Sequence, residues 1–199
     1  MDLLRFEDAA GWEAWLADNH QLQTDAWLQI AKKGSGIASI TVTEALDVAL
    51  CYGWIDAQRR GHDDTWYLQR YCRRRPKSTW SQVNVAKVAA LEAAGRMQPA
   101  GLAEVAAAKA DGRWAAAYEA QRTAQVPPEL AAALAERPDA QAAFDRLSRS
   151  DRYSVILPLL KVRTGQGRAA AVARAIERLA APGQSWPQKK DPDGGTPSP

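Results

Sequence analysis

Cysteine, histidine and methionine are scarce in this chain, with two of each among 199 residues. Two cysteines are too few for a disulfide framework or a four-thiolate zinc site. No run of about 18 apolar residues is present, so the sequence predicts no membrane-spanning helix. Residues 1–8 lack the basic and apolar segments of a secretory signal, and we therefore predict a cytoplasmic location.

Nothing in the overall composition is extreme. The chain has 26 Lys and Arg against 23 Asp and Glu, for a net charge of +3, and 46% of its residues are hydrophobic. These values are close to the average for soluble globular chains and exclude a fibrous, collagenous or wholly disordered protein. The length suits one compact domain or two small ones.

The first eighty residues combine strand and helix signals. Amphipathic spacing predicts a helix over about 7–19, and a second, mostly apolar helix over about 44–52 has Thr41 or Thr43 as its N-cap and Gly53 as its end. Short β-prone runs predict the strands, which lie at 3–6, 26–32, 54–60 and 65–73. The last two strands form a hairpin. We predict an α+β fold with a small mixed or antiparallel sheet.

Alanine dominates the part that follows, with 23 alanines between residues 86 and 147. Such a composition favours helices, and glycine and proline divide it into several short ones. The predicted breaks are Gly95, Pro99–Gly101, Gly112, Pro127–Pro128 and Pro138. Two more helices are expected at about 151–162, where Pro158 should introduce a kink or a break, and at about 167–180. The predicted domains are an α+β domain over 1–80, an all-helical domain over 81–181 packed on it, and a disordered tail over 182–199.

Positive charge is concentrated in one segment. Between Thr65 and Leu91 there are six basic residues and no acidic residue, and four aromatic residues are interleaved with them. A local cluster of this kind can attract anions to one surface. A solvated edge strand, protected from aggregation by its charges, is the alternative interpretation.

Strand alternation divides the hairpin side chains between two faces. If Ile55 and Ala57 face the helices, the opposite face carries a polar and aromatic set from both strands. That face would form a cleft where the helical part covers it. The alternative is that the large aromatic residues belong to an ordinary core. The shared set is Trp54, Asp56, Gln58, Tyr67, Gln69, Tyr71 and Arg73.

The candidate ligand-binding residues extend beyond the hairpin into the next helix. Arginine forks and a helix N-terminus can together hold a phosphate or a carboxylate. A serine that only caps the helix is the alternative for either hydroxyl of Ser78 and Ser81. Besides those of the hairpin (Trp54, Asp56, Tyr67, Gln69, Tyr71 and Arg73), the predicted ligand residues are Arg75, Lys77, Ser78, Trp80 and Asn84.

Catalytic and metal-binding signals are weak. Asp56 is the best candidate for a functional carboxylate, and a salt bridge with a neighbouring arginine is its alternative role. Cys51 is expected to be a small buried hydrophobe. His20 and His62 have no ligand spacing around them, so we predict no metal site and no cofactor.

Several sequence motifs match a known family. They run from Glu44 through Gly53-Trp54-Ile55-Asp56, and continue at residues 73–84, 95–101, 110–114 and 126–130. On these motifs the chain resembles the YdeI/OmpD-associated family of bacteriocin-protection proteins. Relatives often carry proline at the position of Arg73.

The resemblance implies a role in tolerating antimicrobial peptides or envelope stress. We therefore expect a stress-tolerance protein that binds an anionic small molecule, a lipid headgroup or a partner at the basic and aromatic cleft. Single-stranded nucleic acid is the second possibility, because such proteins combine basic and stackable aromatic residues. A hydrolase using Asp56 with arginines is the third.

Overall fold

The computed structural model describes residues 2–181, and the tail predicted at 182–199 lies outside this range. The chain divides into two compact units, residues 1–117 (unit 1) and residues 118–199 (unit 2). The helices α3 and α4 that follow the sheet lie within unit 1. Compactness does not show that a unit folds on its own. The predicted division into domains over 1–80 and 81–181 therefore stays a prediction.

Unit 1 contains a four-stranded mixed sheet in the order β1-β2-β4-β3. The β1 strand is parallel to β2, whereas β2 and β3 both pair with β4 in the antiparallel sense. The strands are β1 (Leu3–Leu4), β2 (Asp25–Ala31), β3 (Trp54–Gly61) and β4 (Trp66–Arg73). The predicted α+β fold with strands in the N-terminal part and helices after it is confirmed.

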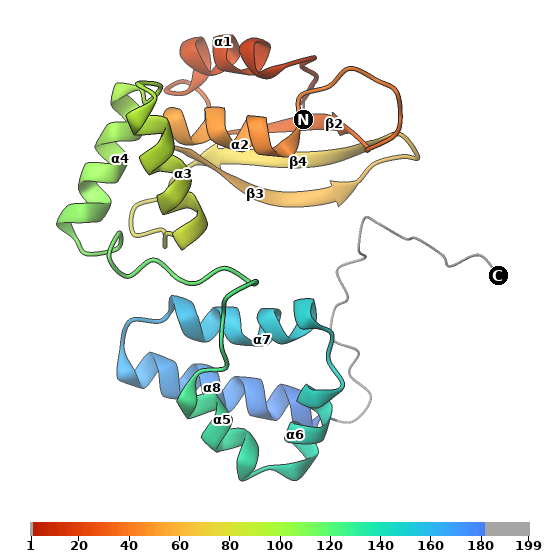
Figure 1. The fold of residues 1–199 in the computed structure, drawn as a ribbon, viewed down its shortest axis with the longest axis vertical. Helices are drawn as coiled ribbons and strands as arrows, with labels where there is room; N and C mark the ends of the chain where they lie inside the picture. Colours follow the sequence, from red (N-terminus) through yellow and green to blue (C-terminus); the bar gives the residue numbers. More distant parts are fainter. Residues whose placement is uncertain (1, 182–199) are drawn as a thin grey trace. The chain divides into compact units, whose positions relative to one another are not determined.

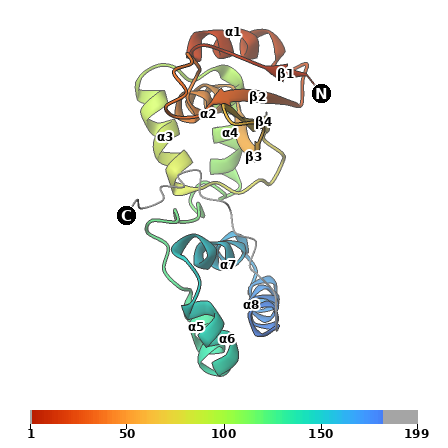
Figure 2. The same cartoon turned by 90° about the vertical axis from the view of Figure 1, so that its right-hand side faces the viewer.

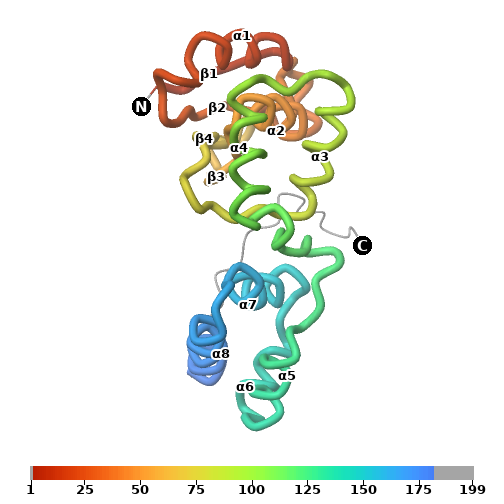
Figure 3. The backbone as a smooth tube through the Cα atoms, turned by 90° about the vertical axis from the view of Figure 1, so that its left-hand side faces the viewer, coloured from red at the N-terminus to blue at the C-terminus, as the bar shows by residue number. Residues whose placement is uncertain are grey.

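Four helices accompany this sheet, at α1 (Ala9–Asn19), α2 (Val42–Cys51), α3 (Gln82–Ala93) and α4 (Pro99–Ala110). The α2 helix begins with a capping box, in which the Thr41 hydroxyl and the Glu44 carboxylate each accept a backbone N–H of the other residue. Figure 1 shows α1 and α2 along the strands. Figures 2 and 3 show α2 and α3 on the same side of the sheet.

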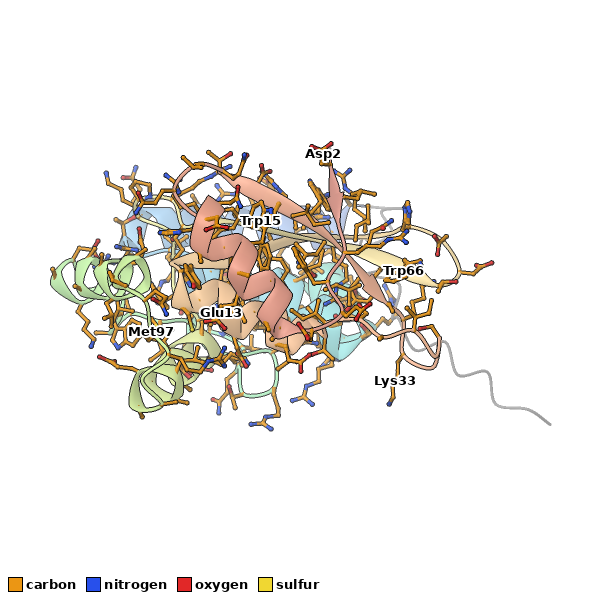
Figure 4. The ribbon with its side chains drawn as sticks, turned by 90° about the horizontal axis from the view of Figure 1, so that it is seen from above. Asp2, Glu13, Trp15, Lys33, Trp66 and Met97 are labelled. Carbon is orange, nitrogen blue, oxygen red and sulfur yellow. The ribbon has the colours of Figure 1, made fainter. Side chains whose placement is uncertain are left out.

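Aromatic residues build the core of unit 1 on the face of the sheet that the helices cover, which we call the inner face. Trp12 of α1 is fully buried and lies 6.3 Å from Trp54 and 5.8 Å from Tyr71, between ring centroids. Trp15 of α1, labelled in Figure 4, stacks on Trp12. Ala26 and Leu28 of β2 complete this face. The aromatic residues thus fix α1 against the hairpin.

A glycine lets α4 approach α2 closely. A Cβ atom on Gly101 would lie 2.2 Å from the backbone oxygen of Cys51, so no other residue fits this position without a shift of the backbone. The Gln98 N–H also donates to the Cys51 carbonyl, at 3.1 Å. The sequence predicted a break at residues 99–101, and α4 in fact begins at Pro99 and includes Gly101.

Unit 2 consists of helices in its described part: α5 (Pro128–Ala135), α6 (Pro138–Asp145), α7 (Arg149–Lys161) and α8 (Gly165–Ala180). Proline occupies the first turn of α5 and of α6, where its missing N–H costs nothing. The α7 helix continues through Pro158, so of the predicted kink or break the break is absent. Leu130, Phe144, Leu159 and Ile176 belong to its separate hydrophobic core. None of the helices in residues 2–181 is long and apolar enough to cross a membrane.

Candidate functional site

Three of the predicted ligand residues, Trp54, Tyr71 and Trp80, belong to the hydrophobic core of unit 1. Trp54 and Tyr71 are fully buried on the inner face, and the Tyr71 hydroxyl donates to the Val42 carbonyl at 3.2 Å. The expectation that these rings point away from the helices is therefore wrong, and the alternative, an ordinary core position, is correct. The physical reason is size, because large aromatic rings fill the space between α1 and the sheet.

The inner face becomes polar toward the hairpin turn. Gln69 is buried and accepts a hydrogen bond from the Arg59 Nε at 3.0 Å, while the Arg59 guanidinium lies 4.8 Å from the Tyr67 ring centroid. Partial burial raises the pKa of Tyr67 above its ordinary value. Asp56 is exposed on β3 opposite Tyr71, next to a bulge that ends at Arg59.

Arg73 has a structural role in the loop after α1. Its Nη2 atom donates to the carbonyl oxygens of His20, Gln21 and Gln23. These carbonyls follow the last turn of the helix, where backbone acceptors lack helical partners. Arg73 therefore fastens β4 to the end of α1.

The basic segment continues in a tight turn from Arg75 to Ser78. The Ser78 N–H donates to the Arg75 carbonyl at 3.0 Å, and Lys77 has a φ angle of +66°. Pro76 supplies the fixed φ that favours the second position of such a turn, and the third position requires a left-handed residue. Lys77 is the single described non-glycine residue with a positive φ. Strained turns of this kind are enriched at functional sites.

Buried and half-buried side chains meet at this turn, and we call them the arginine–tryptophan cluster (Arg74, Ser78, Trp80, Arg113 and Trp114). The guanidinium carbon of Arg74 lies 3.5 Å from the Trp80 ring centroid, and the Trp80 and Trp114 centroids are 4.8 Å apart. Arg74 is 4% exposed and Trp80 is 2% exposed. A guanidinium stacked on an indole at this distance is a strong cation–π contact.

Arg113 joins the turn to the end of α4. It is buried, its Nε donates to the Asp111 carboxylate at 2.6 Å, and its Nη1 donates to the Ser78 carbonyl at 3.1 Å. Lys109 lies over the Trp114 ring at 5.4 Å. Residues 73–81 and 109–114 together hold six basic residues and one carboxylate, that of Asp111.

The hydroxyl oxygen of Ser78 and the indole nitrogen of Trp80 are buried without a hydrogen-bond partner in the described part of the chain. Buried polar groups are nearly always hydrogen-bonded, and each exception requires an explanation. Both atoms can donate a hydrogen, and both lie beside buried arginines.

The residues after the cluster start α3. Ser81 caps this helix by accepting the Asn84 N–H at 3.2 Å, so the capping alternative is correct for Ser81. Ser78 has no such role, since α3 begins at Gln82, four residues later. The side chains of Arg75 and Lys77 are exposed beside the cluster. Of the predicted ligand residues, the structure thus brings Ser78 and Trp80 together, with Arg75 and Lys77 in the same turn.

Three members of the cluster were missing from the predicted ligand set: Arg74, Arg113 and Trp114. Arg74 is the middle residue of three consecutive arginines, Arg73 to Arg75. The sequence does not indicate which of the three is buried. Arg113 and Trp114 follow Asp111 and Gly112, a motif that the resemblance had already singled out. Arg113 and Trp114 lie more than 30 residues after the turn in the sequence, so the sequence did not predict their contact with it.

Cys51 is buried at the end of α2, as predicted. Desolvation in this apolar environment raises the pKa of its thiol to about 11. A nucleophilic cysteine needs a depressed pKa and access to a substrate. Cys51 therefore has the properties of a packing residue.

Two families match different parts of this chain. Residues 4–104 match a family described as a domain of unknown function (DUF8412), and residues 123–181 match the family described as bacteriocin-protection, YdeI or OmpD-associated. The comparisons with curated proteins and with solved structures gave no match. The sequence motifs between residues 44 and 84 lie in the first match, and the four helices of unit 2 lie in the second. The chain therefore belongs to the DUF8412 family, and the predicted resemblance to the bacteriocin-protection, YdeI or OmpD-associated family is confirmed as a match over residues 123–181.

Proposed function

We propose that this protein serves in bacteriocin protection or a related stress tolerance by binding a small anion, a phosphate or a carboxylate, at the arginine–tryptophan cluster. The observation that carries the proposal is the pair of buried donors, the Ser78 hydroxyl and the Trp80 indole N–H, which have no acceptor among the described residues. The role in protection rests on the family match over residues 123–181.

The energetics favour a bound acceptor. A buried donor without a partner costs about 1 to 3 kcal/mol, and this cost disappears when an oxygen atom accepts the hydrogen. Phosphate and carboxylate oxygens also match arginine N–H groups in charge and geometry. The six basic residues around one carboxylate leave this region with excess positive charge.

The side chains that surround these donors are held in place before a ligand arrives. Arg74 is stacked on Trp80, and Arg113 is fixed by Asp111 and by the Ser78 carbonyl. Side chains that are ordered in advance lose little conformational entropy on binding. Arg75 and Lys77 are exposed next to them and would raise the local anion concentration.

Calorimetric titration with inorganic phosphate and with citrate tests this proposal on the full chain. We expect at least one of them to bind wild-type protein, and Ser78→Ala to bind at least tenfold more weakly. Ser81→Ala is the matched control, because it removes a nearby serine that caps α3, and it should bind like wild type. An absence of binding by both anions, or unchanged binding in Ser78→Ala, would contradict the proposal.

A lipid headgroup presents the same phosphate chemistry on a membrane surface. Flotation of the protein with phosphatidylglycerol vesicles distinguishes this source from a free anion. Co-flotation that Ser78→Ala abolishes would identify a headgroup, whereas binding of phosphate alone would identify a soluble ligand. The cytoplasmic location stays a prediction, and cell fractionation tests it.

The link to protection needs a measurement in cells. A strain without this protein should survive a bacteriocin challenge less well than its parent, and wild-type protein should restore survival. Trp80→Phe keeps an aromatic ring at this position and removes the indole N–H, so we expect it to restore survival only in part. Full rescue by both Ser78→Ala and Trp80→Phe would separate the cluster from protection.

A further inference from the structure

The sheet of unit 1 has a second face, which we call the outer face. Paired residues on neighbouring strands share a face, and the register places Trp27 opposite Arg70, and Leu68 between Gln29 and Arg60. These side chains point away from the inner face of Ala26, Leu28 and Tyr71. Figures 2 and 3 show α2 and α3 on the inner side. The proposed anion site does not use the outer face.

Two arginine–tryptophan stacks lie on the outer face. The guanidinium carbon of Arg5 is 4.7 Å from the Trp66 ring centroid, and that of Arg60 is 4.8 Å from the Trp27 ring centroid. Arg5 also donates to the Gln29 side chain. Arg5 and Arg60 are exposed residues, so both guanidinium groups are accessible. Figure 4 shows Trp66 at the end of the unit opposite Met97.

The strand residues between the stacks expose little apolar surface. Trp27 and Leu68 are buried, yet neither belongs to a hydrophobic core cluster of the described residues. Gln29 is 4% exposed and accepts from Arg5. This face therefore does not form part of the core; it presents stacked cations over aromatic rings.

The charge of the outer face is positive. Among Arg5 and the strand residues that the register places on this face, there are three arginines (Arg5, Arg60 and Arg70) and one carboxylate, Asp25, which pairs with Arg70 at 2.5 Å. Trp66 pairs with Ala31, four residues along β2 from Trp27, which separates the two stacks by about 13 Å along the strands. A few nucleotides of a single strand can span such a distance.

We propose that the outer face binds single-stranded nucleic acid. Unpaired bases stack on aromatic rings and on arginine planes, and aromatic residues on an open four-stranded sheet are a recurrent platform for two or three bases. The arginines supply the phosphate contacts that give such binding its charge dependence. An acidic protein segment would pair with the arginines but would make no contact that requires the two stacks. In single-stranded nucleic acid the phosphates pair with the arginines and the bases stack on the planar groups.

Fluorescence anisotropy with labelled oligo(dT) and oligo(U) of about 12 nucleotides tests this inference on the full chain. We expect binding to weaken as salt rises from about 50 to 200 mM. The double variant Arg5→Ala/Arg60→Ala should bind at least tenfold more weakly. Arg60→Lys keeps the charge without the planar stack and should lose an intermediate amount. Circular dichroism confirms that each variant is folded.

Two control variants distinguish oligonucleotide binding at the outer face from nonspecific attraction to exposed arginines and from binding at the arginine–tryptophan cluster. Arg137→Ala removes an exposed arginine that pairs with Asp139 in unit 2, and Ser78→Ala removes a donor of the proposed anion site. Both should bind the oligonucleotides within twofold of wild type. An absence of oligonucleotide binding at low salt would overturn the inference. Equal losses in Arg137→Ala and the double variant, or displacement by polyglutamate as effective as by unlabelled oligonucleotide, would also overturn it.

Discussion

Arg74 lies flat on Trp80, with its guanidinium carbon 3.5 Å from the ring centroid, and both side chains are almost completely buried. Burial of an arginine is unfavourable unless hydrogen bonds and neighbouring groups compensate for the lost hydration. The Thr79 carbonyl accepts one hydrogen bond from Arg74 at 3.5 Å. A buried cation beside two donors without acceptors is the arrangement on which the proposed anion site depends.

The Ser78 hydroxyl should lower the stability of the protein when no ligand is bound. We expect Ser78→Ala to raise the free energy of unfolding by about 1 kcal/mol in phosphate-free buffer, because a buried donor without a partner is removed. Ser81→Ala should lower it by about 1 kcal/mol, because α3 loses its cap. Urea unfolding of the two variants measures both changes. Destabilisation by Ser78→Ala would mean that this hydroxyl has a partner in the folded protein.

The left-handed conformation of Lys77 should carry a measurable cost. Left-handed backbone costs about 1 to 2 kcal/mol in residues with a Cβ atom, and glycine adopts it freely, although glycine loses more entropy on folding. We therefore expect Lys77→Gly to be more stable by up to about 1 kcal/mol, and Lys77→Val to be less stable than wild type. Thermal unfolding at one pH compares them. A Lys77→Gly protein less stable than Lys77→Val would contradict this description of the turn.

The contact between α4 and α2 depends on Gly101. A methyl group there would overlap the Cys51 carbonyl, so Gly101→Ala should destabilise unit 1 by about 3 kcal/mol or more. Gly165 is the matched control, because a Cβ atom at this position in α8 would meet no atom within 4 Å. Gly165→Ala should be neutral or slightly stabilising. Chemical denaturation distinguishes the two, and equal effects would show that the close approach is absent.

The capping box of α2 predicts a dependence on pH. Hydrogen bonds from Thr41 hold the pKa of Glu44 below its ordinary value, and the bond from the backbone N–H contributes more than the bond from the hydroxyl. A lowered pKa in the folded state means that the ionised carboxylate contributes stability above its unfolded pKa of about 4.3 and loses it as the pH falls through the folded pKa. Glu44→Ala should cost about 0.5 to 1 kcal/mol at pH 7 and less at pH 3. A cost that is equal at both pH values would contradict this role.

Arg73 should stabilise the loop after α1. Removal of its hydrogen bonds to three carbonyls predicts faster amide hydrogen exchange at residues 20–24 in Arg73→Ala. Arg75→Ala is the matched control, because its side chain is exposed in the next turn, and it should leave exchange in that loop unchanged. Hydrogen exchange with mass spectrometry reads both variants. A large loss of anion affinity in Arg73→Ala, without a change in exchange, would instead identify it as a ligand residue.

The sequence predicted the elements of this fold well, because local signals determine them. Thr41 with Glu44, Gly53 after α2, and the prolines at the start of α5 and α6 mark boundaries that the structure confirms. The faces of the hairpin were harder to predict. Trp54 could lie on either face, since alternation gives two faces and does not say which one the helices cover.

The arginine–tryptophan cluster could be predicted only in part. The basic run and Trp80 were visible in the sequence, and Ser78 belonged to the predicted ligand set. Arg113 and Trp114 contact the turn because the chain after α4 lies next to it. This is a tertiary contact, and no local sequence pattern predicts it. Likewise, the buried member of the run from Arg73 to Arg75 is chosen by tertiary packing, since all three have the same side chain.

The most direct test of the proposed anion site is the indole N–H signal of Trp80 in a proton–nitrogen correlation spectrum. The chain has eight tryptophans, and Trp80→Phe identifies the Trp80 signal by its loss. Titration with the anion that binds in calorimetry should move this signal downfield, as the free donor gains an acceptor, while the Trp12 indole, already bonded to the Ala45 carbonyl, stays in place. A Trp80 signal that does not move at saturating anion would contradict the central claim.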